Sequence, residues 1–158
     1  MSDQPHEYFL KQAIDLAVQS AQTKGGPFAA VIVQNGKVIG KGHNQVTSNC
    51  DPSAHAEIMA IRDACKTINS HLLSDCTIYS SCEPCPMCMS AIYWARIPSL
   101  IFAATASDAA NAGFDDQFIT DELKKPYTER QISIQHIAHA ERNKSFEEWL
   151  ANADHIEY

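Results

Sequence analysis

The fold is decided by residues 76–96, which read CTIYSSCEPCPMCMSAIYWAR. Cys76 to Ser80 is rich in β-forming side chains and predicts a strand, while Met87 to Arg96 predicts a helix. Two prolines lie between these segments, where proline favours a sharp loop and the first turn of a helix. Cys85 and Cys88 therefore fall at a helix start. The order of strand, loop and helix is typical of α/β proteins.

Helices and strands alternate along the rest of the chain. The expected helices are His6–Gln22, Ala54–Lys66, Ser107–Asn111 and a last short segment through Trp149 and Leu150. The further expected strands are Phe28–Val33, Lys37–Gly42, Ser99–Ala104 and Gln131–Ile137. We expect a three-layer α/β/α sandwich with a central mixed sheet, built as a single domain over residues 1–158.

Turn and capping signals support parts of this assignment. Asn35-Gly36 separates the first two strands and is a strong signal for a tight β-hairpin. Gly113 closes the short helix that begins near Ser107. Ser145 with Glu148 predicts a capping box at the start of the last helix.

Composition narrows the class of protein. The chain has 158 residues, of which 45% are hydrophobic and 20% charged, as in a globular domain of ordinary size. Its formal charge of −7 makes a nucleic-acid partner unfavourable. No apolar run is long enough to span a membrane, and the N-terminus lacks a signal-peptide pattern. We expect a cytoplasmic location, where the six cysteines are more suited to metal binding or burial than to disulfides.

His55, Cys85 and Cys88 supply one imidazole and two thiolates, which are three ligands for one zinc ion. Each falls at the start of an expected helix, where unpaired backbone amides stabilise a thiolate. Three protein ligands leave one zinc position open, and Glu57 stands two residues from His55 to move protons. This set predicts hydrolytic chemistry at one zinc ion per subunit.

Three alternatives compete with this interpretation. Cys82 could be a fourth ligand, which would close the site and make the zinc structural. Its place on the extended chain before the turn favours a side chain that points away from the site. Cys82 and Cys85 could instead form a redox pair, but that leaves His55 and Glu57 without a role. A zinc-stabilised binding module without catalysis is the third, and it gives Glu57 no purpose.

His-x-Glu followed by Pro-Cys-x-x-Cys is the signature of zinc nucleobase deaminases. In that chemistry two thiolates and a neutral imidazole balance the zinc charge, while the metal still acidifies water. The resemblance assigns Glu57 to take the proton of that water and pass it to the ring nitrogen and the departing amine.

Further motifs resemble those of bacterial guanine deaminases of the cytidine-deaminase-like fold, and the match covers nearly the whole chain. They are Gly25-Gly26-Pro27-Phe28, His55-Ala56-Glu57, Ser81-Cys82-Glu83-Pro84-Cys85-Pro86-Met87-Cys88, Ala91-Ile92-Tyr93-Trp94-Ala95-Arg96, Ala112-Gly113-Phe114-Asp115-Asp116 and Glu157-Tyr158. The resemblance implies a zinc-dependent aminohydrolase that converts guanine to xanthine and ammonia, in purine catabolism or salvage. It also implies a homodimer whose C-terminal segment, about 131–158, can dock on the partner subunit and close the pocket.

The same resemblance implies the residues that contact a purine. These are Asn44 at the purine edge, Phe28 and Phe114 as stacking walls, Asp116 as an acceptor, Ala56 and Trp94 in the pocket, and Tyr158 over the substrate. From the residues alone, Asn44 is equally a turn residue, Phe28 and Phe114 are more often core, and Trp94 is either core or pocket wall. Asp116 is equally a helix cap, and its neighbour Asp115 competes for the role.

A tRNA adenosine deaminase is the main alternative function, because residues 55–62, HAEIMAIR, resemble that family closely. The acidic balance of the chain and of its C-terminal segment counts against an RNA substrate. Cytosine and other small aminated heterocycles are further alternatives, since the zinc motifs do not choose the substrate.

Overall fold

A four-stranded mixed sheet organises the first part of the molecule, which a computed structural model describes over residues 4–158. The strands are β1 (Ala29–Gln34), β2 (Lys37–His43), β3 (Cys76–Cys82) and β4 (Ser99–Ala104), in the order β2-β1-β3-β4. β1 pairs antiparallel with β2 and β3, whereas β3 and β4 are parallel. The mixed sheet expected from the sequence is confirmed.

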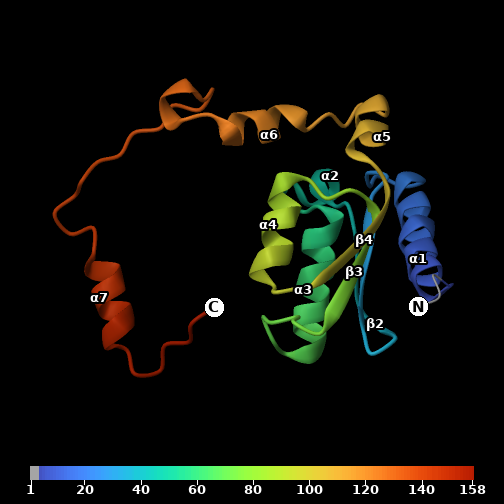
Figure 1. Ribbon diagram of the computed structural model, residues 1–158, viewed down its shortest axis with the longest axis horizontal. Coiled ribbons are helices and arrows are strands. Elements are labelled where there is room, and N and C mark those ends of the chain that lie inside the picture. The colour runs from blue at the N-terminus through green and yellow to red at the C-terminus, as the bar shows by residue number, and fades with distance from the viewer. Residues whose placement is uncertain (1–3) are drawn as a thin grey trace. The chain divides into compact units, whose positions relative to one another are not determined.

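Helices cover both faces of this sheet (Figure 1). α1 (Gln4–Ala21) packs on one face, and α3 (Ala56–Ile68) and α4 (Pro86–Trp94) pack on the other. The alternation of side chains along a strand supplies both layers of core. On β3, Ile78 packs in the cluster that includes α3 and α4 residues, while Tyr79 packs with Phe9 and Ala13 of α1. The three-layer α/β/α sandwich is therefore confirmed.

The hairpin between β1 and β2 forms as the sequence predicts. Asn35 and Gly36 have φ of 51° and 74°, the positive values that a tight hairpin turn requires. Beyond the hairpin lies a short helix, α2 (Val46–Asn49), which is not among the helices expected from the sequence.

Two glycines let α3 approach the edge strand β2. A Cβ at Gly40 would lie 2.6 Å from the Ala60 carbonyl oxygen, and one at Gly42 would lie 2.2 Å from that of Ala56. Both distances are to backbone, which cannot turn aside as a side chain can. The Gly-Lys-Gly sequence of β2 therefore positions the helix whose first turn carries Glu57.

The short helices after the sheet are α5 (Ala106–Asn111), α6 (Gln117–Lys124), a 3-10 turn (Tyr127–Glu129) and α7 (Lys144–Ala151). The chain divides into two compact units, the first ending at Phe118 and the second spanning Ile119–Tyr158. Within the second unit, Glu122 accepts hydrogen bonds from Lys125 and from the backbone amide of Gln131. The single domain expected over 1–158 stays a prediction.

Two expectations for the second unit are wrong. Gln131–Ile137 forms no strand, because its alternating pattern has no neighbouring strand to pair with in the described chain. The last helix begins at Lys144 after Asn143, so Ser145 lies inside it and makes no capping box. A capping box forms instead at α5, where the Thr105 hydroxyl accepts from the Asp108 amide and the Asp108 carboxylate accepts from the Thr105 amide.

Among the described residues, no helix is both long enough and apolar enough to cross a membrane.

Candidate active site

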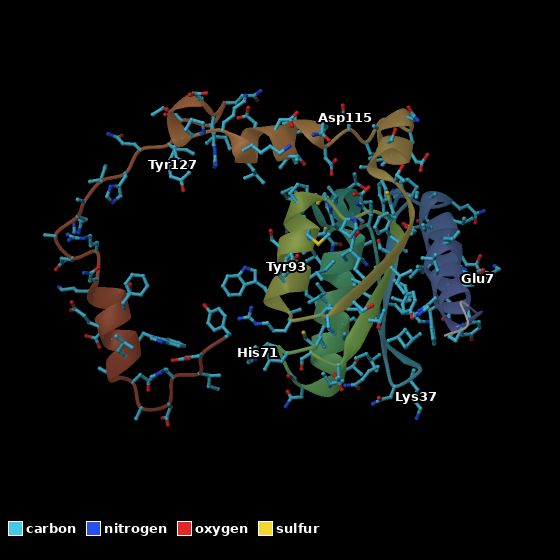
Figure 2. The ribbon with its side chains drawn as sticks, in the orientation of Figure 1. Glu7, Lys37, His71, Tyr93, Asp115 and Tyr127 are labelled. Atoms are coloured by element: carbon cyan, nitrogen blue, oxygen red, sulfur yellow. The ribbon has the colours of Figure 1, made fainter. Side chains whose placement is uncertain are left out.

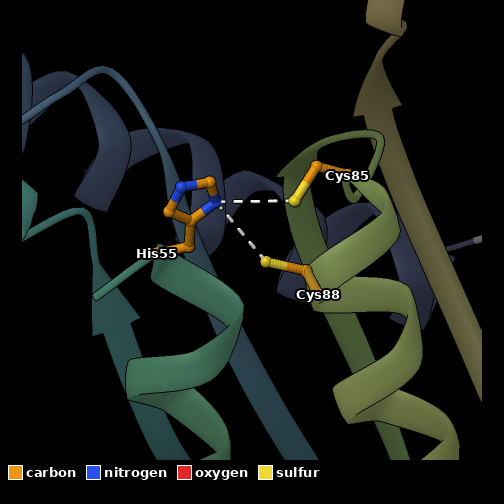
Figure 3. A group of neighbouring side chains, drawn as sticks. All are labelled: His55, Cys85 and Cys88. Atoms are coloured by element: carbon orange, nitrogen blue, oxygen red, sulfur yellow. Dashed lines mark hydrogen bonds between the residues drawn. The ribbon is translucent and has the colours of Figure 1, made fainter. Parts of the chain in front are cut away.

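His55, Cys85 and Cys88 converge between the starts of two helices (Figure 3). His55 is the N-cap residue of α3 and Cys85 is the N-cap residue of α4, both with extended backbone. The Cys85 and Cys88 sulfurs each lie 3.6 Å from Nδ1 of His55. All three candidate ligand atoms lie within 4.8 Å of one another. The helix starts that the sequence predicts thus bring three ligands to one point.

The local electrostatics favour a thiolate at this point. Hydrogen bonding with the Cys88 thiol, and then with His55, lowers the pKa of the Cys85 thiol to about 4. The hydrogen bond to Cys85 and the burial of the site raise the pKa of Cys88. Hydrogen bonding to Cys85 also raises the pKa of His55. Two thiols this close cannot both ionise without a cation between them.

This donor set fits zinc. Zinc prefers thiolate sulfur and imidazole nitrogen in a tetrahedral arrangement, and a catalytic site uses three protein ligands. A divalent cation among these atoms removes the repulsion that keeps Cys88 protonated, so both sulfurs can bind as thiolates. His55, Cys85 and Cys88 are the residues that would hold it.

Cys82 is not part of this group. Its sulfur donates a hydrogen bond to the Thr105 carbonyl oxygen at 3.7 Å. Burial raises the pKa of the Cys82 thiol, which favours the neutral form that does not bind metal. Among the described residues, the cluster of potential ligands contains His55, Cys85 and Cys88 without Cys82. The geometry is therefore unfavourable for a closed, four-ligand structural site.

Glu57 lies in the first turn of α3 with only 6% of its surface exposed. The hydroxyl of Ser80 on β3 donates a hydrogen bond of 3.0 Å to its Oε1 atom. Burial raises the pKa of Glu57, and hydrogen bonds, including the one from Ser80, oppose that rise. A buried carboxyl group with a raised pKa is suited to proton transfer near neutral pH.

Two aromatic rings lie against each other near the N-terminal end of β1. Phe28 and Phe114 have ring centroids 4.9 Å apart at an interplanar angle of 86°. The Asn44 amide donates a hydrogen bond to the Phe28 carbonyl, and the Asn44 side chain accepts one from Val46. Gly26 packs against this side chain, since a Cβ there would lie 3.1 Å from Cγ of Asn44. Phe28, Asn44 and Phe114 are thus brought into one neighbourhood.

Asp115 lies in the segment between α5 and α6 (Figure 2), and its neighbour Asp116 has different surroundings. The Asp115 side chain accepts a hydrogen bond from the Gln117 amide, as a residue preceding a helix commonly does. Burial and the charge of Cys85 raise the pKa of Asp116, while His55 lowers it. Asp116 is therefore close enough to the ligand cluster to be affected by it.

The remaining predicted substrate contacts are Ala56, Trp94 and Tyr158. Ala56 is fully buried at the first position of α3, next to the His55 ligand. Trp94 ends α4, six residues after Cys88 and so about 9 Å farther along the helix. Tyr158 lies in the second unit, where its ring contacts Trp149 at a centroid distance of 6.4 Å. The pocket roles of all three stay predictions.

The sequence patterns predicted no role for Ser80, Gly40 or Gly42. The signal for Ser80 is a serine placed between Ile78 and Cys82 on one face of a buried strand. Glycines alternating within a predicted strand indicate close approach of another backbone, which is the case for Gly40 and Gly42. What the pattern could not supply is the identity of the neighbouring element.

Known proteins resemble this chain in sequence and in fold. A family model for the cytidine and deoxycytidylate deaminase zinc-binding region matches residues 3–104. Guanine deaminase of Bacillus subtilis is 49% identical over 154 residues, which cover 97% of this chain and 99% of that protein. Its X-ray structure has a TM-score of 0.94 and covers 97% of this chain and 98% of its own.

More distant relatives match a smaller part. A tRNA-specific adenosine deaminase of Aquifex aeolicus is 43% identical over 98 residues, which are 62% of this chain and 65% of that protein. A structure of guanine deaminase from Nitrosomonas europaea is 33% identical with a TM-score of 0.65, covering 68% of this chain and 63% of its own. The chain belongs to the zinc-binding cytidine and deoxycytidylate deaminase family.

Proposed function

We propose that the protein is a zinc-dependent guanine deaminase, which hydrolyses guanine to xanthine and ammonia in purine catabolism or salvage. The choice of guanine as the substrate rests on one observation: the match to the guanine deaminase of Bacillus subtilis extends over 97% of the chain at 49% identity. The matches to tRNA-specific adenosine deaminases of Aquifex aeolicus and Streptococcus pyogenes cover less of the chain, 62% and 73%.

The zinc ligands in this proposal are His55, Cys85 and Cys88, with one ion per subunit. When bound, zinc acts as a Lewis acid that makes water a stronger nucleophile near neutral pH. In the net reaction water oxygen adds to C2 of guanine, the bond from C2 to the exocyclic nitrogen breaks, and ammonia leaves.

Glu57 moves the protons of this reaction. Its carboxylate accepts a proton as the water oxygen attacks and delivers it to the ring nitrogen. It then takes the remaining proton of the added hydroxyl group and delivers it to the departing amine. Burial supports this assignment, because it keeps bulk water from exchanging the proton before delivery. The Ser80 hydroxyl donates to Oε1 of Glu57 and so holds the carboxyl group in place.

The substrate contacts are proposed from the resemblance. The proximity of Phe28, Asn44 and Phe114 to one another supports them. Phe28 and Phe114 would bound a flat purine, and Asn44 would offer a donor and an acceptor to its edge. Asp116 is favoured over Asp115 as an acceptor, because the Asp115 side chain is engaged with Gln117. Ala56, Trp94 and Tyr158 complete the proposed set.

A homodimer with exchanged C-terminal segments is the proposed assembly. In the described chain β4 is an edge strand, with β3 as its neighbour in the sheet. Ile132 and Ile134 alternate in the segment predicted to be a strand, and they are 73% and 42% exposed. A second copy can supply both the missing strand partner and the cover for these side chains. The cytoplasmic location stays a prediction.

The test is a panel for ammonia release by zinc-loaded protein. Guanine is compared with adenine, cytosine, cytidine and a tRNA anticodon stem-loop. We expect release from guanine with xanthine formed in equal amount, and little from the other substrates. Release from the RNA without release from guanine would overturn the proposal and favour the adenosine deaminase alternative.

Subunit exchange is tested with mixed dimers. A Glu57→Gln chain is combined with a chain that lacks residues 131–158, each inactive alone under the proposal. Recovered activity requires a C-terminal segment supplied by the partner, whereas no recovery indicates that each segment serves its own chain.

A further inference from the structure

Two adjacent serines near the end of β3 face opposite sides of the sheet. Ser80 lies on the same side as Ile78, toward α3, and Ser81 lies on the same side as Tyr79, toward α1. Ser80 is 1% exposed and Ser81 is 8% exposed. Two hydroxyl groups of similar burial are therefore held by one strand, with different partners on each face.

The partners differ in chemistry. The Ser80 hydroxyl donates to Oε1 of Glu57 at 3.0 Å. The Ser81 hydroxyl accepts from the Ala29 amide at 3.0 Å, and so completes the backbone pairing next to β1. One serine contacts the proposed proton carrier, and the other contacts only the framework.

We propose that Ser80 is a positioning residue for Glu57: its hydroxyl holds the carboxyl group in the orientation from which it exchanges protons. This inference rests on the proposed function, because it gives Ser80 a role in the reaction through Glu57.

Strand geometry makes the contact rigid. Ser80 pairs with Ala30 on β1 and with Phe102 on β4, so neighbouring strands hold its backbone on both sides. Its side chain has one rotatable bond before the hydroxyl oxygen. Glu57 is on a helix and has three such bonds, so the short side chain is the one that restrains the long one. A carboxyl group held in this way needs less reorganisation when the substrate arrives.

Other roles for Ser80 are less consistent with the geometry. Its hydroxyl donates its hydrogen to the Glu57 carboxylate, whereas the candidate metal ligands are His55, Cys85 and Cys88. Ser80 is 1% exposed, so its hydroxyl is directed to Glu57 and not to solvent. The contact to Glu57 is the remaining chemistry available to it.

The test compares Ser80→Ala, Ser80→Thr and Ser81→Ala in zinc-loaded protein. Ser80→Ala removes the hydroxyl, and we expect kcat for guanine to fall roughly 10- to 100-fold with KM nearly unchanged. Ser80→Thr keeps the hydroxyl in a strand that accepts a β-branched residue, and should recover most of kcat. Ser81→Ala should lower the melting temperature and leave kcat near that of the wild type.

Coupling to Glu57 is measured by adding Ser80→Ala to Glu57→Gln. If Ser80 acts through Glu57, the double variant has the same residual kcat as Glu57→Gln alone. If Ser80→Ala lowers kcat by the same factor in the Glu57→Gln variant as in the wild type, the inference is overturned. A Ser80→Ala variant with wild-type kcat would also overturn it.

Failure of the proposed function has a separate signature. A wild type that releases no ammonia from guanine overturns guanine as substrate, whatever the Ser80 variants do. The inference about Ser80 then depends on a crystal structure of zinc-loaded Ser80→Ala. More than one Glu57 rotamer supports it, and a single rotamer identical to that of the wild type overturns it.

Discussion

The two units of the chain differ in how they use apolar side chains. In the first unit Ala30, Ile32, Leu73 and Ile78 are fully buried between the sheet and its helices. In the second unit, Ile119–Tyr158, all of which the structure describes, no residue is buried within the single chain. The first unit carries its own core and the ligand cluster. The second unit has apolar patterns but lacks a surface of its own to bury them.

This difference predicts a large contrast in backbone amide hydrogen exchange. Amides of β1 lie in hydrogen-bonded strands, so we expect them to exchange about 10,000-fold or more slowly than unprotected amides. Residues 132–137 have no strand partner within the described chain, so they should exchange rapidly in dilute, single-chain protein. Exchange is read by mass spectrometry at two protein concentrations.

Protection of residues 132–137 that appears only at high concentration would support segment exchange between two copies. Strong protection in single chains at dilution would contradict the contrast between the units.

Glu57→Gln should have the largest effect on catalysis in the first unit. Glutamine keeps the size of the side chain but cannot carry the proton, so we expect kcat to fall about 100- to 10,000-fold. Zinc content and melting temperature should stay close to the wild type.

Glu83→Gln is the matched control. Its carboxylate is exposed and accepts a hydrogen bond from the Ala106 amide at the start of α5. Its kcat should remain near the wild-type value. Full activity in Glu57→Gln would remove Glu57 from the mechanism.

Cys85→Ser and Cys82→Ser separate the open zinc site from a closed one. Cys85→Ser replaces a ligand and should weaken zinc affinity by more than about 100-fold. Cys82→Ser should keep one zinc per chain, because the Cys82 sulfur bonds to a carbonyl oxygen instead. Zinc content after dialysis against a competing chelator measures both. Equal loss in the two variants would indicate four cysteine and histidine ligands.

Gly42→Ala should have the smallest of these effects, on stability. The added methyl group meets the backbone of α3, which should cost about 1–3 kcal/mol in the free energy of unfolding. Lys41→Ala changes the exposed neighbour and should alter it by less than about 0.5 kcal/mol. Denaturant titration of zinc-loaded protein measures the difference. Similar stability of Gly42→Ala and the wild type would contradict the close approach of α3 to β2.

Local patterns predicted the first unit well. Asn35-Gly36 predicted the hairpin, since positive φ at both residues is a local property. His55 and Cys85 were expected at helix starts, and both are N-cap residues. The ligand cluster forms because α3 and α4 contact each other and their starts meet at one point.

Long-range relations could not be obtained from local patterns. Gln131–Ile137 has the alternation of a strand, but a strand forms only beside a partner. Ser145 and Glu148 have capping-box spacing, yet the helix begins one residue before Ser145. Thr105 and Asp108 have similar spacing and do form the box. The contact of Ser80 with Glu57 joins a strand to a helix and depends on how the layers pack.

The most direct test of the central claim is zinc titration of metal-free protein, with xanthine formation from guanine measured at each step. If His55, Cys85 and Cys88 form one open site, the rate rises in proportion to added zinc and levels off at one ion per chain. The metal-free protein should be inactive. Guanine turnover that is independent of zinc, or that requires more than one ion per chain, would contradict the account.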